Sequence, residues 1–256
     1  IQNWLWHLGD GRTANGLSPI LEYKTAGTYN VSLIVTDSNG CLDTAVNPQK
    51  VTVYDTIPPP VPLAYRVTVE PDNSIRFDFA VYPRPDFGNY IIYKAIAGQP
   101  LQIYKYINAL NDTVFIDNSV NPDNNSYTYK VVNQSICDRF SSERNSRAHT
   151  SILLKGTSDT NATHLFWSAY DGWDKVETYH IYRKEPRKTN FEKIGFVAGT
   201  QTTYTDSSAF CDVVYKYYVF AEEDTLSLYH QFSRSNTIAL RSPRTRENLS
   251  FCISNA

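Results

Sequence analysis

A segment of this chain occurs twice. Tyr90-Ile-Ile-Tyr-Lys94 returns as Tyr179-His-Ile-Tyr-Arg183, so position 90 corresponds to position 179, an offset of 89 residues. Residues 113–117 match 202–206 at the same offset, and residues 127–131 match 215–219 after a shift of one residue. A period of this length is that of a small independent domain rather than of a solenoid repeat. Each copy is therefore expected to bury a core of its own.

Within each copy, short stretches of alternating apolar and polar residues predict β-strands. Ser74-Ile-Arg-Phe-Asp-Phe79 alternates strictly in the first copy. Further strands are expected near residues 89–95, 101–107, 112–117, 126–132 and 144–151. Aromatic residues, which suit the pleated surface of a sheet, make up 14% of the chain. Together these features predict an all-β chain of tandem immunoglobulin-like β-sandwiches.

Residues 1–54 stand outside the repeat but also predict strands. Trp4-Leu-Trp6 begins an aromatic alternation that ends at Gly9-Asp10-Gly11, a turn whose glycines can take positive φ. Residues 27–36 alternate apolar side chains onto one face, as in a half-buried strand. Residues 37–40 then provide a hairpin turn, and residues 50–54 a returning strand.

A proline-rich stretch separates this first segment from the repeat. Consecutive prolines favour an extended polyproline conformation and cannot donate to a sheet ladder, so residues 55–62 are expected to form a semi-rigid spacer. The predicted division is therefore a first module at 1–54, a linker at 55–62, two repeated modules at 61–150 and 151–240, and a tail or further domain at 241–256.

The first segment resembles the polycystic-kidney-disease (PKD) repeat. The matching residues are Trp6, Gly9, Asp10, Gly11, Pro19, Tyr23, Gly27, Tyr29, Val31, Leu33 and Val35. Leu8 and Leu21 depart from the family, which has Phe at the first position and often His at the second. Complete PKD modules have further strands before this pattern, so the resemblance implies a module lacking its first strands. Such a module would leave an apolar face and a sheet edge uncovered.

The two repeated modules resemble fibronectin type III domains. Trp167 stands on the second strand of the second copy, where that family keeps a core Trp, and Phe79 takes this place in the first copy. Tyr127 and Tyr215 stand at the tyrosine corner, where a Tyr hydroxyl ties a loop back to the sixth strand.

Neither composition nor motifs indicate catalysis. The chain has no nucleophile elbow, zinc-protease motif, phosphate loop or dinucleotide fingerprint, and its five histidines are scattered, so it is not expected to be an enzyme. With 24 Lys and Arg against 26 Asp and Glu, it offers no basic stripe for nucleic acid. No stretch is apolar over the length of a membrane span. No cofactor is expected, although the turns at Asp72-Asn73 and Asp123-Asn-Asn125 could hold structural calcium or simply be turns.

One loop of the repeat is a candidate for recognition. Asp171-Gly-Trp-Asp174 and residues 82–87 follow the second strand of each copy, where sandwich proteins often place binding loops. Trp173 is expected either to contact a ligand or to contact the preceding module. The loop lies at the end that faces that module, which favours the second interpretation.

The domain order resembles the large surface adhesins of gliding bacteria, which are exported by type IX secretion. A PKD-like module precedes two fibronectin-like modules, joined by the Asp-Thr-Ile-Pro-Pro linker at 55–59. This resemblance implies a secreted or cell-surface protein that acts as a rigid spacer or binding array in adhesion or gliding motility. Its partners would be other domains of the same long chain, surface carbohydrate or protein ligands, or a secretion or motility complex. Two alternatives stay open: an accessory spacer arm of a secreted hydrolase, and a subunit or client of such a complex.

Two kinds of covalent modification are also expected. The Asp-Thr-aliphatic signal for O-glycosylation in those bacteria occurs at Thr44, Thr56, Thr113 and Thr225. Cys211 and Cys252 are placed at the same end of the last module and could form a disulfide, whereas Cys41 and Cys137 are expected to be too far apart to pair.

Overall fold

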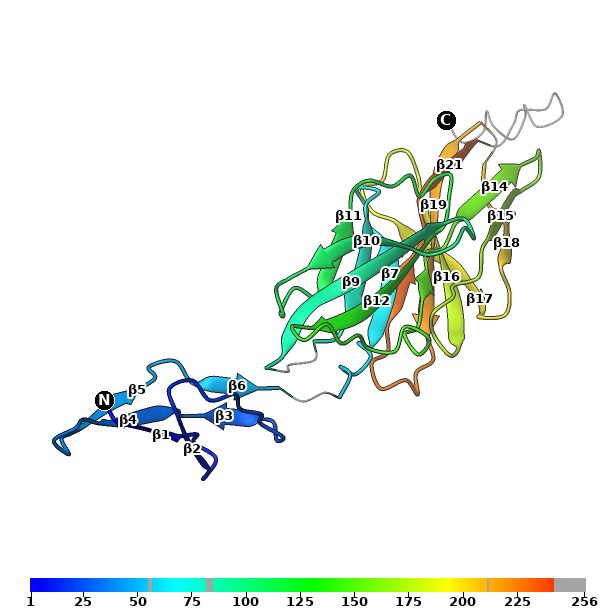
Figure 1. Cartoon of the computed structure of the whole chain (residues 1–256). Coiled ribbons are helices and arrows are strands. Elements are labelled where there is room, and N and C mark those ends of the chain that lie inside the picture. The colour runs from blue at the N-terminus through cyan, green and yellow to red at the C-terminus, as the bar shows by residue number, and fades with distance from the viewer. Residues whose placement is uncertain (55–56, 82–84, 211, 242–256) are drawn as a thin grey trace. The chain divides into compact units, whose positions relative to one another are not determined.

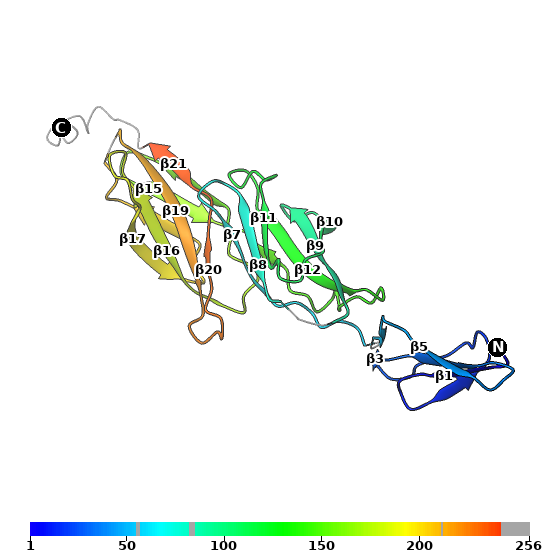
Figure 2. The same ribbon diagram turned by 90° about the vertical axis from the view of Figure 1, so that its left-hand side faces the viewer.

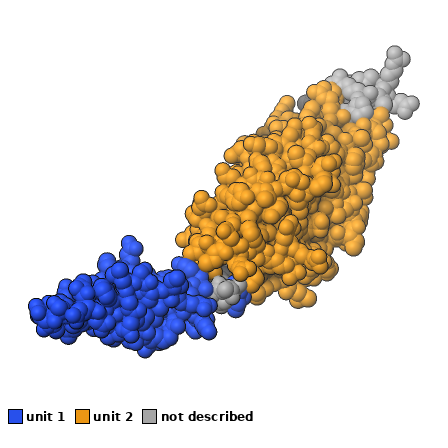
Figure 3. Space-filling view, in the orientation of Figure 1, with its two compact units in different colours: residues 1–57 blue, residues 58–256 orange. Residues whose placement is uncertain are grey.

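The computed structural model describes residues 1–54, 57–81, 85–210 and 212–241. All the regular elements there are β-strands, which confirms the predicted all-β class. The chain forms two compact units, Ile1–Ile57 and Pro58–Ala256 (Figure 3). Within the described residues, no helix is long and apolar enough to cross a membrane.

The first unit consists of two antiparallel sheets. Its strands are β1 (Asn3–His7), β2 (Thr13–Asn15), β3 (Gly27–Tyr29), β4 (Ser32–Thr36), β5 (Leu42–Val46) and β6 (Val51–Val53). Four of them pair in the order β2-β1-β4-β5, and β3 pairs with β6. The turn after β1 requires glycine, because Gly9 has a φ of +79° and a Cβ there would lie 2.6 Å from the carbonyl oxygen of Asn30.

The core of the first unit is small. Leu8, at 1% exposed, is the one fully buried hydrophobic residue among those described in this unit. Its carbonyl accepts a 2.9 Å hydrogen bond from the Tyr23 hydroxyl. Trp6 and Leu33 pair across β1 and β4 but stay half exposed, and with Val31 they line a groove of about 330 Å³. One apolar face of the sheet is therefore open.

The second unit begins with a seven-stranded sandwich, here called module 1 (Figure 1). Its strands are β7 (Ala64–Val69), β8 (Ile75–Phe79), β9 (Phe87–Ile96), β10 (Gln102–Ile107), β11 (Val114–Asp117), β12 (Tyr127–Ser135) and β13 (His149–Thr150). Three strands form one sheet in the order β11-β8-β7, and four form the other in the order β10-β9-β12-β13.

Module 2 repeats this arrangement. Its strands are β14 (Leu154–Ser158), β15 (Thr163–Trp167), β16 (Val176–Lys184), β17 (Glu192–Ala198), β18 (Thr203–Asp206), β19 (Val214–Glu223), β20 (Phe232–Arg234) and β21 (Ile238–Arg241). The sheets are ordered β14-β15-β18 and β17-β16-β19-β20, and the last strand is broken, so that β20 and β21 both pair with β19. The three-plus-four order shared by both modules is that of a fibronectin type III domain.

Each module buries its own core, as the length of the repeat predicts. In module 1 the core is built around Phe77, Tyr90 and Tyr129, all fully buried. In module 2 it contains Trp167 and Tyr179, whose rings meet edge to face at 5.4 Å. The inward-facing residues of both sheets thus supply the apolar burial that stabilises a sandwich.

The tyrosine corner is present in both modules. The Tyr127 hydroxyl accepts a 2.8 Å hydrogen bond from the amide of Asn121. The Tyr215 hydroxyl accepts a longer one, 3.4 Å, from the amide of Phe210. In each case a loop upstream of the sixth strand is fixed to that strand, as the sequence predicts.

Candidate functional site

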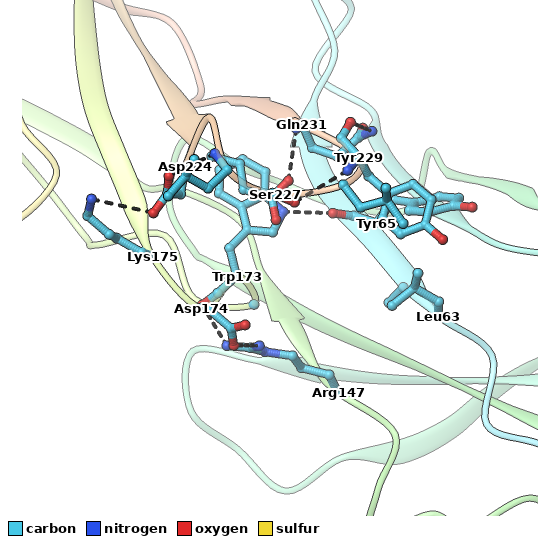
Figure 4. Close-up of a pocket in the computed structure, with 15 residues that line it drawn as sticks. Leu63, Tyr65, Arg147, Trp173, Asp174, Lys175, Asp224, Ser227, Tyr229 and Gln231 are labelled. Atoms are coloured by element: carbon cyan, nitrogen blue, oxygen red, sulfur yellow. Dashed lines mark hydrogen bonds and ion pairs between the residues drawn. The ribbon is translucent and has the colours of Figure 1, made fainter.

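A cavity of about 420 Å³ lies where loops of module 2 meet the first strand of module 1 (Figure 4). Its walls come from the β15–β16 loop at residues 168–175, the β19–β20 loop at residues 224–231 and the start of β7. Corresponding loops carry the recognition surface of immunoglobulin variable domains. The cavity is therefore the candidate binding site of the second unit.

Trp173 forms the inner wall of this cavity. Its indole Nε1 donates a 2.7 Å hydrogen bond to the carbonyl oxygen of Tyr65, which belongs to module 1. Its ring packs 4.0 Å from that of Tyr170, and only 8% of the residue is exposed. Of the two roles predicted for Trp173, contact with the preceding module is confirmed, because little of the ring is left to meet a ligand.

Beneath Trp173, Tyr170 connects the two modules through its hydroxyl. The oxygen accepts a 3.0 Å hydrogen bond from the amide of Val67 and lies 2.8 Å from Nδ1 of His149, both in module 1. Burial raises the pKa of Tyr170, so the phenol stays protonated. Burial, helped by the charge of Arg147, lowers the pKa of His149 to about 3. The Tyr170–His149 contact is therefore uncharged at neutral pH.

Gly172 allows this close approach. Its φ is +141°, and a Cβ on it would lie 2.3 Å from Nδ1 of His149. Any side chain at this position would have to displace the buried imidazole or move the loop. The glycine of the Asp-Gly-Trp-Asp motif is thus explained by packing between modules.

Charged side chains form the rim of the cavity. Arg147 makes an ion pair with Asp174 and donates a 2.6 Å hydrogen bond to the Trp173 carbonyl. At another point of the rim, Lys175 pairs with Glu177 and with Asp224, the latter at 3.5 Å. The hydrogen bond to Glu177 raises the pKa of Lys175. These exposed pairs contribute little stability but present both signs of charge to a ligand.

The outer wall is apolar and faces solvent. Leu226 is 91% and Leu228 is 87% exposed, and the ring of Tyr229 lies 4.9 Å from that of Tyr65. Neighbouring leucines this exposed in one loop indicate an interaction surface. The cavity can therefore hold an apolar group between aromatic and leucine side chains, with ion pairs at its edge.

The predicted modification sites lie apart from one another. Thr44 is exposed on β5 of the first unit, Thr113 is half-buried just before β11, and Thr225 is exposed in the loop beside the cavity. Thr56, Cys211 and Cys252 lie outside the described residues. Cys41 and Cys137 are exposed, free thiols.

The carboxylates of the two acidic turns considered for calcium accept hydrogen bonds from neighbouring residues of the protein. Asp72 accepts hydrogen bonds from the amide and hydroxyl of Ser74 at 3.0 and 2.7 Å. The carboxylate of Asp123 accepts from Asn73 and Asn236, at 3.3 and 3.4 Å. Among the residues that the structure describes, no group of three His, Cys, Asp or Glu side chains is arranged to hold a metal ion.

A buried charged cluster occurs in both modules and was missed in the sequence. Lys94 pairs with Asp117 at 2.6 Å in module 1, and Arg183 pairs with Asp206 at 2.8 Å in module 2. The aligned repeat was the signal that could have found these pairs, because each partner recurs at the same offset of 89 residues. Their burial between strands points to a structural role.

Comparison with known proteins finds relatives of the first unit. Residues 1–53 match the PKD domain family. The pre-pro-metalloprotease PrtV of Vibrio cholerae is 38% identical over 58 residues, which is 23% of this chain and 6% of that protein. Collagenase ColQ1 of Bacillus cereus is 45% identical over 40 residues, or 16% of this chain and 4% of that protein. The matches thus span a small part of much longer relatives.

Solved structures give a weaker comparison. A segment of two fibronectin type III domains from chicken tenascin covers 72% of this chain and 97% of its own, with 13% identity and a TM-score of 0.27. The strand order of modules 1 and 2 carries their assignment to this fold.

Proposed function

We propose that the chain is a non-catalytic modular segment of a large secreted or cell-surface bacterial protein, where it acts as a rigid spacer and binding array in adhesion or gliding motility. The observation that carries this proposal is the buried contact between modules 1 and 2. Trp173, Tyr170 and His149 fix the relative orientation of two sandwiches that a flexible linker would leave free. A spacer needs that fixed orientation.

The larger protein is supported by the relatives of the first unit. In each of them the PKD-like segment is a few per cent of a long chain. This supports a role for the chain beside other domains of the same polypeptide, and the names of the relatives are compatible with export. Type IX secretion and O-glycosylation at Thr44, Thr56, Thr113 and Thr225 belong to the same proposal. The exposure of Thr44 and Thr225 supports it, because a transferase needs access to the hydroxyl.

The binding part of the proposal rests on the cavity. Exposed leucines beside aromatic rings and paired charges suit a protein ligand that inserts an apolar side chain. We also propose the Cys211–Cys252 disulfide, which mapping of peptides without reduction would test; free thiols at both positions would contradict it.

A second candidate function is an accessory arm of a secreted hydrolase. It is favoured by the names of the PKD relatives, a metalloprotease and a collagenase. In that case this segment would hold a protease domain at a set distance from its protein substrate.

Replacement in the parent protein separates these functions. Residues 58–241 are exchanged for an unrelated two-sandwich segment of similar length, and the double variant Leu226→Ser/Leu228→Ser is made in parallel. Phe196→Ser serves as control, because Phe196 is 68% exposed but does not line the cavity. Surface attachment of the cells and hydrolysis of gelatin are measured.

The results distinguish spacer, binder and hydrolase arm. Loss of attachment in the leucine variant, but not in Phe196→Ser, supports binding through the cavity. Retention of attachment after the exchange supports a spacer. Loss of gelatin hydrolysis after outright deletion of residues 58–241, with hydrolysis kept after the exchange and attachment intact, supports the hydrolase arm. Normal attachment after outright deletion of residues 58–241 would overturn the adhesion proposal.

A further inference from the structure

Two strands from different modules lie side by side within the second unit. β7 opens module 1 and β20 closes module 2, and the two are neighbours in Figure 2. Arg66 donates a 3.1 Å hydrogen bond to the carbonyl of Phe232, and the Ser233 hydroxyl donates one of 2.7 Å to the carbonyl of Val67. The residue numbers rise together on both strands, so the strands are parallel.

Side chains rather than a backbone ladder join these strands. The next contact in the series is a 2.9 Å hydrogen bond from the Arg234 amide to the Thr68 hydroxyl. Ser233 is 0% and Thr68 is 6% exposed, so both hydroxyls bond away from water. We call this contact between β7 and β20 the seam. Separating the strands would leave both buried hydroxyls without a hydrogen-bond partner, which is costly, so these bonds stabilise the seam.

The seam also reaches the first strand of module 2. Asn236 follows β20 and is 0% exposed. Its side-chain oxygen accepts a 2.7 Å hydrogen bond from the backbone amide of Leu154, and its side-chain nitrogen donates one of 3.2 Å to the Leu154 carbonyl. The same nitrogen donates a 3.4 Å bond to the carboxylate of Asp123 in module 1. The end of the seam is thereby fixed to β14 as well as to module 1.

The direction of the strands decides how force would act on the seam. The second unit begins just before β7 and its described part ends with β21. β20 and β21 both run antiparallel to β19, so they point the same way, and β7 runs parallel to β20. A pull on the two ends therefore draws β7 toward its N-terminal end and β21 toward its C-terminal end. These are opposite directions along nearly the same axis, so the contact between the strands is sheared.

We propose that the seam between β7 and β20 is a mechanical clamp that lets modules 1 and 2 carry tension as one body. In this geometry the bonds at Arg66, Ser233 and Arg234 are loaded together in shear and must fail together. The load also passes directly from the first to the last strand, so the connection at residues 151–153 is spared. The biological meaning rests on the proposed spacer role, but the clamp itself rests on strand geometry alone.

Single-molecule stretching of the full chain between its termini tests the clamp. The double variant Thr68→Val/Ser233→Ala removes two hydroxyls of the seam. Ser141→Ala is the matched control, because Ser141 is 2% exposed and its hydroxyl accepts a 2.9 Å bond from the Asn133 amide inside module 1. A second attachment uses tags inserted at the turn after Gly98 and at the turn at Asp138, which loads β10, β11 and β12 of module 1 and leaves β7 and the seam unloaded.

Clamp and mere stability predict different results. For the native chain pulled by its termini, we expect modules 1 and 2 to extend in one step of about 600 Å, at roughly 3.4 Å per residue. The seam variant should rupture about tenfold faster at a given force. It should rupture at the native rate in the second attachment, and the control should show no loss specific to end-to-end pulling.

Two outcomes would overturn the clamp. One is extension of the modules in two independent steps in the native chain, and the other is an equal acceleration of the seam variant in both attachments. Neither outcome bears on attachment of cells, so the clamp and the adhesion role can fail separately.

Discussion

The carboxylate of Asp117 accepts a 2.8 Å hydrogen bond from the hydroxyl of Tyr129 in the core of module 1. Asp206 and Tyr217 repeat this contact at 2.9 Å in module 2. A cation completes each cluster, Lys94 in module 1 and Arg183 in module 2. Both copies of the repeat thus contain the same buried ion pair and hydrogen bond in addition to an apolar core.

Removing the carboxylate should leave a buried cation without its partner. We expect Asp117→Asn to lower the free energy of unfolding by about 3 kcal/mol or more, because the Lys94 side chain is only 9% exposed. Urea unfolding measures the loss. The double variant Asp117→Asn/Lys94→Met should recover part of it, and a double variant as unstable as the sum of both singles would contradict the coupling.

The same carboxylates should make stability depend on acid. Burial alone would raise the pKa of Asp117, but Lys94, Tyr129 and the Ser119 amide together lower it below its ordinary value. Because the folded pKa is below the unfolded one, the stabilisation is complete above the unfolded pKa and is lost as pH falls through the folded pKa. Urea midpoints of the native chain and Asp117→Asn should therefore converge as pH falls below about 4. A constant difference down to the lowest pH would refute this.

His149 should make stability depend on pH at higher pH values than Asp117 does. Its folded pKa of about 3 lies below the unfolded value near 6.5, so the unfolded chain takes up a proton that the folded chain excludes. As pH is lowered from about 6.5 to about 3, the free energy of unfolding should fall by up to about 1.4 kcal/mol per pH unit. His149→Gln should flatten the dependence in this range. A native slope that survives His149→Gln would assign the effect elsewhere.

Trp173 should couple the unfolding of the two modules. Trp173→Ala removes the bond to the Tyr65 carbonyl and the packing on Tyr170, at a cost of about 3–5 kcal/mol. We expect one calorimetric transition of modules 1 and 2 to split into two. Trp173→Phe, which keeps most of the packing, should split it less. A single transition at an unchanged temperature in Trp173→Ala would contradict the coupling.

The sequence predicted what is local or repeated. The tyrosine corners at Tyr127 and Tyr215, the separate cores and the contact role of Trp173 all follow from patterns within one module or from its recurrence. Period-2 alternation is strong in these strands because one face of each sheet is buried.

The seam could not be predicted in this way. Ser233 and Val67 are 166 positions apart, and a polar run such as Ser233-Arg-Ser-Asn236 looks like any exposed strand edge. A polar side chain reveals its burial only when its partner is known. The repeat also gives no help, because the contact joins the first strand of one copy to the last strand of the other.

The contact of β7 with β20 has a consequence for how the protein stays separate from its copies. β7 ends one sheet and β20 ends another, and open strand edges invite pairing with a second molecule. Here each module covers an edge of the other. Neither module alone would have this protection, so the pair is the smallest part of the second unit that shields both edges from another chain.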